Sequence, residues 1–134
     1  MSTEPERPPQ LDPALVNEFV SKAHGDLDEV QRLVADEPAL VKASWDWGGG
    51  DFETGLGAAA HMGNREIALF LLENGASLDL FAAAMLGYVD VVRETLTAHP
   101  ELRNATGAHG IPLIVHAQQG GEQARSVVEL LEAG

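Results

Sequence analysis

Five histidines and a surplus of acidic residues are the side chains of this sequence that could do chemistry. His24 and His61 each lie within two residues of a glycine that ends a predicted helix. Asp46, Asp51 and Glu53 lie between them in the sequence, and imidazole with carboxylate ligands suits a metal such as zinc. No HxH, HxxxH or HExxH spacing accompanies these histidines. We therefore expect no metal and no cofactor, and keep a metal or enzymatic site near His24 and His61 open as an alternative.

The known signatures of covalent and phosphoryl-transfer catalysis are missing from the sequence. The chain has no cysteine and no Gly-x-Ser-x-Gly pattern for a serine nucleophile. Gly48, Gly49 and Gly50 lack the Lys and Ser/Thr that complete a phosphate-binding loop. The many carboxylates are explained by solvated helix faces. We expect no catalytic residues and no enzymatic activity.

The segment Trp45-Asp46-Trp47, followed by three glycines and Phe52, is the sharpest local feature. Tryptophan is enriched at the energetic centres of protein interfaces. In an extended chain Trp45 and Trp47 share one face and Asp46 points away. The two tryptophans therefore either bind a partner or fold back over the helical core, and the sequence leaves both alternatives open.

Length and composition limit the kinds of fold that can position these residues. The 134 residues predict one domain, and they are 45% hydrophobic but only 5% aromatic, which favours closely packed short helices. A net charge of −13 argues against nucleic acid or an anionic membrane and favours a basic partner. The absence of cysteine and of a long apolar run predicts a cytoplasmic protein. Residues 1–11 are polar and proline-rich and are expected to be a disordered tail.

Helical periodicity accounts for most of the remaining chain. Asp12 and Pro13 have the types of an N-cap and a first helical residue. The stretch 53–76 predicts two short helices, separated by Gly63, which requires a left-handed conformation, and closed by Gly75. Further helix pairs are predicted before and after it. The segment 40–53 is the least helical and is expected to form an extended loop or hairpin.

The helix pairs recur. In each pair a glycine, here called the break glycine, separates the two helices. The break glycines are Gly25, Gly63, Gly87 and Gly120. They are 38, 24 and 33 residues apart, against a period of 33 in ankyrin repeats. Residues 54–59 (TGLGAA) and 111–117 (IPLIVHA) are similar to the Thr-Pro-Leu-His-x-Ala motif, and 63–68 with 87–92 look like outer-helix starts. Over residues 14–134 the chain resembles the ankyrin-repeat family. The resemblance implies an all-α, ankyrin-like α-solenoid of about four helix-turn-helix repeats, at about 12–43, 44–76, 77–105 and 106–134, in a single domain 12–134.

Departures from the family pattern concern the connections. Gly57 and Ile114 replace the motif histidine. The hairpin between the second and third repeats is shortened by about nine residues, so that finger should be nearly absent. The finger before the second repeat is about five residues longer and carries the two tryptophans and Phe52.

The resemblance implies a protein-binding module that uses its fingers and the concave face of its inner helices. Methionine adapts to varied partners, although Met62, Met85 and Leu86 could instead pack between repeats. The partner is expected to be a protein, with a basic one favoured by the net charge, and the chain a monomer or weak dimer. An immunity- or antitoxin-like inhibitor is the alternative function. The predicted partner-binding residues are His24, Trp45, Asp46, Trp47, Phe52, His61, Met62, Met85, Leu86 and Gln118.

Overall fold

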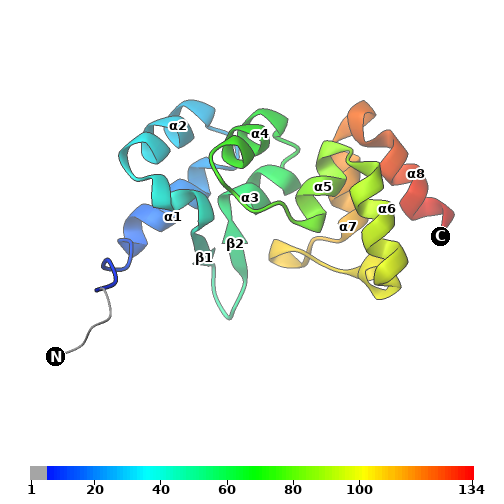
Figure 1. The fold of residues 1–134 in the computed structure, drawn as a ribbon, viewed down its shortest axis with the longest axis horizontal. Coiled ribbons are helices and arrows are strands. Elements are labelled where there is room, and N and C mark those ends of the chain that lie inside the picture. The colour runs from blue at the N-terminus through cyan, green and yellow to red at the C-terminus, as the bar shows by residue number, and fades with distance from the viewer. Residues whose placement is uncertain (1–5) are drawn as a thin grey trace.

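The structure, a computed structural model, describes residues 6–134, which form a mainly helical chain with one small sheet (Figure 1). The eight α-helices of this part are α1 (Pro13–Lys22), α2 (Leu27–Asp36), α3 (Gly55–His61), α4 (Arg65–Glu73), α5 (Leu80–Leu86), α6 (Val89–Ala98), α7 (Leu113–Gln119) and α8 (Arg125–Ala133). The strands β1 (Ser44–Asp46) and β2 (Phe52–Thr54) pair antiparallel. Four 3₁₀ turns are η1 (Pro38–Lys42), η2 (Pro100–Asn104), η3 (Ala108–Gly110) and η4 (Gly121–Ala124).

Side-chain caps fix where five of the helices begin. Each cap accepts a hydrogen bond of 2.7–3.2 Å from a backbone N–H two or three residues further on, which satisfies one of the donors left free in the first turn. The expected start at Asp12 and Pro13 is confirmed. The capping residues are Asp12, Asp26, Thr54, Asn64 and Asp79.

The helices pack in two layers. The odd-numbered helices contact one another in order, α1 with α3, α3 with α5 and α5 with α7, while α2 contacts α4 and α6 contacts α8 (Figure 1). Two apolar clusters fill the space between them. Alanine triplets at 58–60 in α3 and 82–84 in α5 are fully buried, and their small side chains let neighbouring helices approach closely.

The C-terminal ends of α3, α5 and α7, here called the inner helices, approach so closely that there is no room for a side chain at two glycines. Gly63 has the expected positive φ, 67°, and a Cβ there would overlap the backbone carbonyl of Gln119. A Cβ on Gly120 would likewise overlap the carbonyl of Met85. The break glycines therefore do more than end helices, because they let the last turns of α3, α5 and α7 touch through their backbones.

This packing corrects the expected binding surface at Met85 and Leu86. Both residues are buried, with 1% and 2% of their surface exposed. Turn η4 packs across the end of α5, and Arg65 donates a hydrogen bond of 3.0 Å to the carbonyl oxygen of Leu86. Of the two alternatives that the sequence left open for these residues, packing inside the fold is the one that the structure shows.

The connections differ in length as expected. The hairpin β1–β2 precedes α3, and a loop from Ala105 to Pro112 precedes α7, but only residues 74–79 link α4 to α5. The hairpin and the 105–112 loop project on the same side of the molecule (Figure 1). Because the link between them carries no hairpin, the two can meet, and Asp51 in the hairpin bonds His109 in the loop.

None of the helices in residues 6–134 has the length and apolar character needed to cross a bilayer. Of the expected tail, residues 1–5 lie outside the described part, and residues 6–10 are exposed without regular secondary structure. Leu11 is half-buried and packs against the first apolar cluster.

Candidate metal centre

Four side chains converge where the hairpin β1–β2 meets the end of α3 and the turn η3. They are His24, Glu53, His61 and His109, here called the His₃Glu cluster. Nε2 of His24 lies 3.2 Å from Oε1 of Glu53. Nε2 of His61 and Nε2 of His109 lie 2.9 Å and 3.4 Å from Oε2 of the same carboxylate. One nitrogen or oxygen from each of the four residues lies within 4.8 Å of the others. All four residues thus direct donor atoms at one small space.

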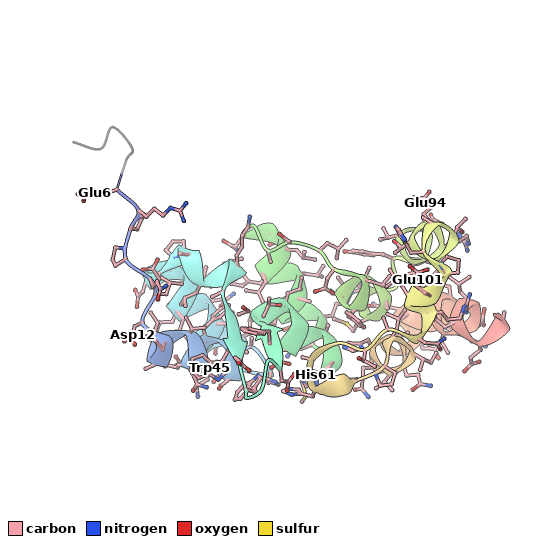
Figure 2. All side chains as sticks on the ribbon, turned by 90° about the horizontal axis from the view of Figure 1, so that it is seen from below. Glu6, Asp12, Trp45, His61, Glu94 and Glu101 are labelled. Atoms are coloured by element: carbon pink, nitrogen blue, oxygen red, sulfur yellow. The ribbon has the colours of Figure 1, made fainter. Side chains whose placement is uncertain are left out.

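Four separate segments bring these side chains together. His24 follows the end of α1 and His61 is the last residue of α3, and since these helices pack together, their ring centroids are 5.0 Å apart. Glu53 is the central residue of β2, which leads directly into α3. His109 lies in η3, with its ring 5.5 Å from that of His61. Figure 2 shows His61 beside the tip of the hairpin and the loop that carries η3.

Hydrogen bonds fix the proton positions of two of the histidines. Nδ1 of His24 lies 2.9 Å from the carbonyl oxygen of Val20, which can only accept, so Nδ1 carries the proton. Nδ1 of His109 donates in the same way to Oδ2 of Asp51 at 2.7 Å. Both Nε2 atoms face Glu53, and in the neutral form of either ring Nε2 offers its lone pair there. Histidine ligands of metals usually have this second bond to a carbonyl or a carboxylate.

Glu53 is a buried acid whose basic neighbours are all histidines. Its side chain has 0% of its surface exposed, and no lysine or arginine of residues 6–134 forms an ion pair with it. Oε1 accepts a hydrogen bond of 2.9 Å from Nε1 of Trp47. Oε2 and Nε2 of His61 are both buried and make no hydrogen bond within the described chain, although they are only 2.9 Å apart. Such atoms are costly to bury unless a further group satisfies them.

Asp51 holds His109 in an unusual backbone conformation. The backbone N–H of His109 donates to Oδ1 of Asp51 at 2.8 Å, and its ring donates to Oδ2. His109 has φ 60°, and it is the one residue other than glycine with positive φ in the described part of the chain. Such strain persists where surrounding contacts enforce it and is common at functional sites. Here it aims the ring at Glu53.

The tip of the hairpin places Asp51 and Trp47. Oδ1 of Asp46 accepts hydrogen bonds of 2.8 Å and 3.0 Å from the N–H groups of Gly48 and Gly50. All three glycines of the tip have positive φ, which permits a turn this tight. Asp46 therefore shapes the turn and stays out of the His₃Glu cluster, although residue types alone do not distinguish it from Asp51 and Glu53.

Charges and burial shift the pKa values in the cluster. Burial lowers the pKa of His61, and the neighbouring His24 and His109 lower it further against the opposing effect of Glu53. Burial also acts to lower the pKa of His109, but the hydrogen bond to Asp51 and the charges of Glu53 and Asp51 outweigh it, so this pKa is raised. Hydrogen bonds from the backbone and ring of His109 lower the pKa of Asp51. Asp51 thus stays anionic and able to hold its histidine.

The donor set fits a transition-metal ion. Three imidazole nitrogens and one carboxylate oxygen suit zinc, iron, nickel or copper. Around a tetrahedral ion with bonds of about 2.0–2.2 Å, neighbouring ligand atoms are about 3.4 Å apart. The distances from Nε2 of His61 and of His109 to Oε2 of Glu53, 2.9 Å and 3.4 Å, are close to that value, and Nε2 of His24 lies 3.2 Å from the other oxygen, Oε1. The widest pairs extend to as much as 4.8 Å, so an ion would draw the outer rings slightly inward.

The other predicted binding residues divide between core and surface. Trp45 packs against the first apolar cluster, which agrees with the alternative in which a tryptophan folds back over the helical core. Trp47 stands over the His₃Glu cluster, with ring centroids 6.3 Å from His24 and 6.1 Å from His109. Phe52 and Met62 are exposed, at 60% and 51%. Gln118 is also exposed.

His109 is the member of the His₃Glu cluster that the sequence did not reveal. It is separated from Asp51 by 58 residues, and neither belongs to a metal-binding spacing motif. The one available signal was the shortened link 74–79, which leaves the hairpin and the 105–112 loop as neighbours. No protein-family model matches the chain, and the search of curated proteins finds no match.

Proposed function

We propose that the chain binds one divalent transition-metal ion, of the zinc class, in the His₃Glu cluster. The observation that carries the proposal is the convergence of three imidazole Nε2 atoms, at 2.9–3.4 Å, on the buried carboxylate of Glu53. A cation bound among these atoms balances the buried carboxylate. In this proposal the chain acts as a binding protein and not as an enzyme.

A network of protons is the competing explanation of the cluster. Extra protons on the imidazoles could neutralise Glu53, and His109 has a raised pKa. One feature favours the ion. His61, the ring closest to the carboxylate, has a lowered pKa and so resists taking up a second proton. The Nδ1 bonds of His24 and His109 direct their Nε2 atoms at Glu53, as in metal ligands.

Metal analysis tests the proposal. The protein is dialysed against zinc, freed of excess ion and assayed for zinc and protein by elemental analysis. We expect one zinc per chain in the wild type, and loss of that ion in Glu53→Gln and His61→Gln. His99→Gln is the matched control, because His99 is exposed at a helix end outside the cluster. Zinc below one tenth of an equivalent in the wild type, or equal zinc in all four proteins, would overturn the proposal.

Protein binding by an ankyrin-like helical stack is a second candidate function. It is supported by the succession of four helix pairs and by Phe52, Met62 and Trp47, three large apolar side chains exposed by 60%, 51% and 40%. Exposed apolar groups of this kind are typical of interaction sites. The net charge of −13 favours a basic partner. The inhibitor alternative rests on the same charge and stays a prediction.

A comparison of surface variants tests this second function. Phe52→Ser and Met62→Ser remove exposed apolar surface and leave the His₃Glu cluster intact. Affinity capture from the native lysate should lose a specific partner in the double variant. Leu78→Ser is the control, because Leu78 is also exposed, at 43%, but lies in the link 74–79. An identical set of captured proteins for the two variants would contradict the proposed surface.

A further inference from the structure

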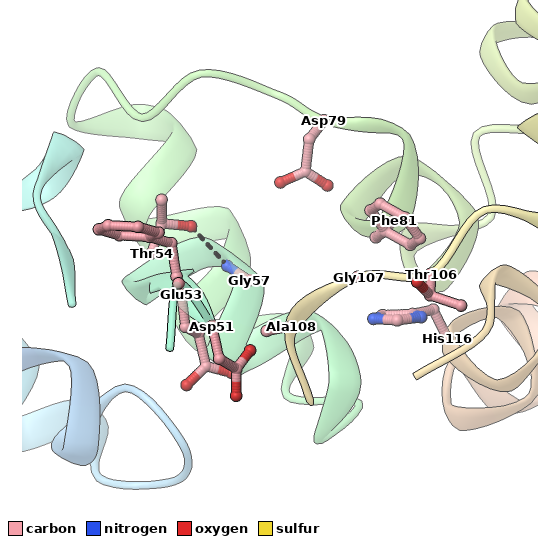
Figure 3. A pocket seen from close by; sticks show the side chains of 12 residues that line it. Asp51, Glu53, Thr54, Gly57, Asp79, Phe81, Thr106, Gly107, Ala108 and His116 are labelled. Carbon is pink, nitrogen blue, oxygen red and sulfur yellow. Dashed lines mark hydrogen bonds between the residues drawn. The ribbon is translucent and has the colours of Figure 1, made fainter. Parts of the chain in front are cut away.

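A cavity of about 420 Å³ lies beside the short link between α4 and α5, which carries no hairpin. The hairpin β1–β2 and the start of α3 form one wall, and the 105–112 loop with α7 forms the other (Figure 3). The start of α5 closes the cavity between these walls. Its volume lies within the range of about 300–1,000 Å³ typical of small-molecule sites.

His116 points a free nitrogen into this cavity. The residue is 2% exposed, and its Nδ1 lies 2.9 Å from the carbonyl oxygen of Pro112, to which it must donate. Nε2 is therefore an acceptor in the neutral ring, and it receives no hydrogen bond from residues 6–134. Figure 3 shows the ring directed toward the wall formed by Asp51 and Glu53. Phe81 packs on His116 with ring centroids 4.8 Å apart.

Gly107 keeps the tip of His116 uncovered. A Cβ at this position would lie 3.3 Å from both Cε1 and Nε2 of His116 and 3.4 Å from Cδ1 of Phe81. The φ of Gly107 is −93°, which alanine also adopts, so the backbone does not demand glycine here. Glycine thus preserves open space at the acceptor nitrogen.

Asp79 supplies a second acceptor and a negative charge. Oδ1 caps α5 through a hydrogen bond of 2.7 Å from the N–H of Ala82, while Oδ2 accepts none from the described chain. Its charge acts on His116, where it opposes the lowering of the pKa by burial. Figure 3 shows the carboxylate of Asp79 on the same side of the cavity as Phe81.

The remaining lining determines which ligands are compatible. Phe52 and Phe81 give apolar surface, and Asp51 and Glu53 add further carboxylates. No lysine or arginine occurs among the described lining residues, so phosphates and carboxylates would lack a counter-charge. A ligand that donates hydrogen bonds and carries positive charge matches both acceptors, and the aromatic rings suit an ammonium group.

We propose that this cavity binds a small organic ammonium ion with an apolar ring or chain, held by Asp79 and by Nε2 of His116. Benzylamine, benzyl alcohol and benzoate serve as probes of nearly equal size but different charge. Each is titrated into the full chain while the amide of Gly107 and the ring protons of His116 are followed by NMR. We expect saturable shifts with benzylamine, at a dissociation constant on the order of a millimolar, and much weaker binding of benzoate.

Three variants sharpen the test. Asp79→Asn keeps a capping side chain for α5 and should weaken benzylamine binding by about tenfold. Asp36→Asn removes an equal charge from an exposed position on α2 and should leave binding unchanged. Gly107→Ala should cover Nε2 of His116 and abolish the shifts there, with the fold checked by circular dichroism. Benzoate binding as well as benzylamine, absence of any saturable shift, or unchanged binding in Asp79→Asn would overturn the proposal.

His61→Gln separates this cavity from the proposed metal site. His61 does not line the cavity, so this variant should lose zinc and keep benzylamine binding. The two proposals can then fail independently. Loss of benzylamine binding in His61→Gln would show that the amine binds at the His₃Glu cluster, and would overturn the assignment to the cavity.

Discussion

At the scale of single residues, the proposed metal site depends on side chains that hold the four residues of the His₃Glu cluster in place. Asp51 bonds His109 at both its backbone N–H and its ring. Trp47 donates to Glu53, and the carbonyl of Val20 accepts from His24. These partners fix ring orientation and proton position, so the Nε2 atoms face inward before any ion binds. Preorganisation of this kind accounts for a large part of the affinity of a metal site.

Asp51→Asn should therefore weaken zinc binding without removing a ligand. The amide keeps the size of the carboxylate but no longer offers two charged acceptors to His109, so we expect a loss of affinity of about 10–100-fold. Competition with a chromophoric chelator measures this affinity. Asp36→Asn again provides the control for charge alone. Equal zinc affinities in the Asp51 variant and the wild type would show that Asp51 does not position His109.

His116 makes folding depend on pH outside the metal site. Burial lowers the pKa of this histidine below the value of an exposed ring. The unfolded chain therefore binds a proton near pH 6.5 that the folded chain does not yet accept, and stability falls as the pH drops below about 6.5. Urea unfolding in chelator at pH 7.5 and pH 5.5 should show a larger loss for the wild type than for His116→Gln. Identical losses would contradict a buried neutral His116.

At the scale of elements, the sequence predicts helix ends better than it predicts the turns between helices. Asp12 is expected to cap a helix and does so, and the least helical segment does form a hairpin. Sequence patterns do not predict the 3₁₀ turns η1 and η2, although each begins at a proline after a helix. Local chemistry decides the caps, whereas burial of Leu40 against the core helps decide the form of η1.

Gly63→Ala tests the close contact between inner-helix ends. The new Cβ would overlap the carbonyl of Gln119, and the residue has φ 67°. Overpacking and a left-handed alanine together should reduce the free energy of unfolding by about 2–4 kcal/mol. Gly25→Ala is the control, since nothing lies within 4 Å of its Cβ position, and should change stability by less than about 0.5 kcal/mol. Chemical denaturation that gives equal stabilities for the two variants would contradict this packing.

At the scale of the whole molecule, the His₃Glu cluster connects parts of the chain from residue 24 to residue 109. Sequence patterns could place His24 and His61 at equivalent positions, because each precedes a break glycine. They could not place His109, whose contact with Asp51 depends on the short link 74–79 and on how the second half of the molecule packs against the first. The helical content and the unequal connections were thus predictable, while the complete ligand set required the three-dimensional arrangement.

Zinc should stabilise the whole fold, because it binds residues that only folding brings together. An excess of about 100-fold over the dissociation constant adds about 2.7 kcal/mol, equivalent to roughly 10 °C in the unfolding midpoint of a chain this size. Differential scanning calorimetry with zinc and with chelator measures the shift. His99→Gln should keep it and His61→Gln should lose it. A zinc-dependent rise that persists in His61→Gln would place the stabilising ion elsewhere.

The most direct test of the central claim is a crystal structure of the zinc-loaded protein with anomalous data at the zinc absorption edge. The proposal predicts one strong anomalous peak at about 2.0–2.2 Å from Nε2 of His24, His61 and His109 and from a carboxylate oxygen of Glu53. Absence of a peak at these four atoms in zinc-loaded crystals, or a single peak held by other residues, would contradict it.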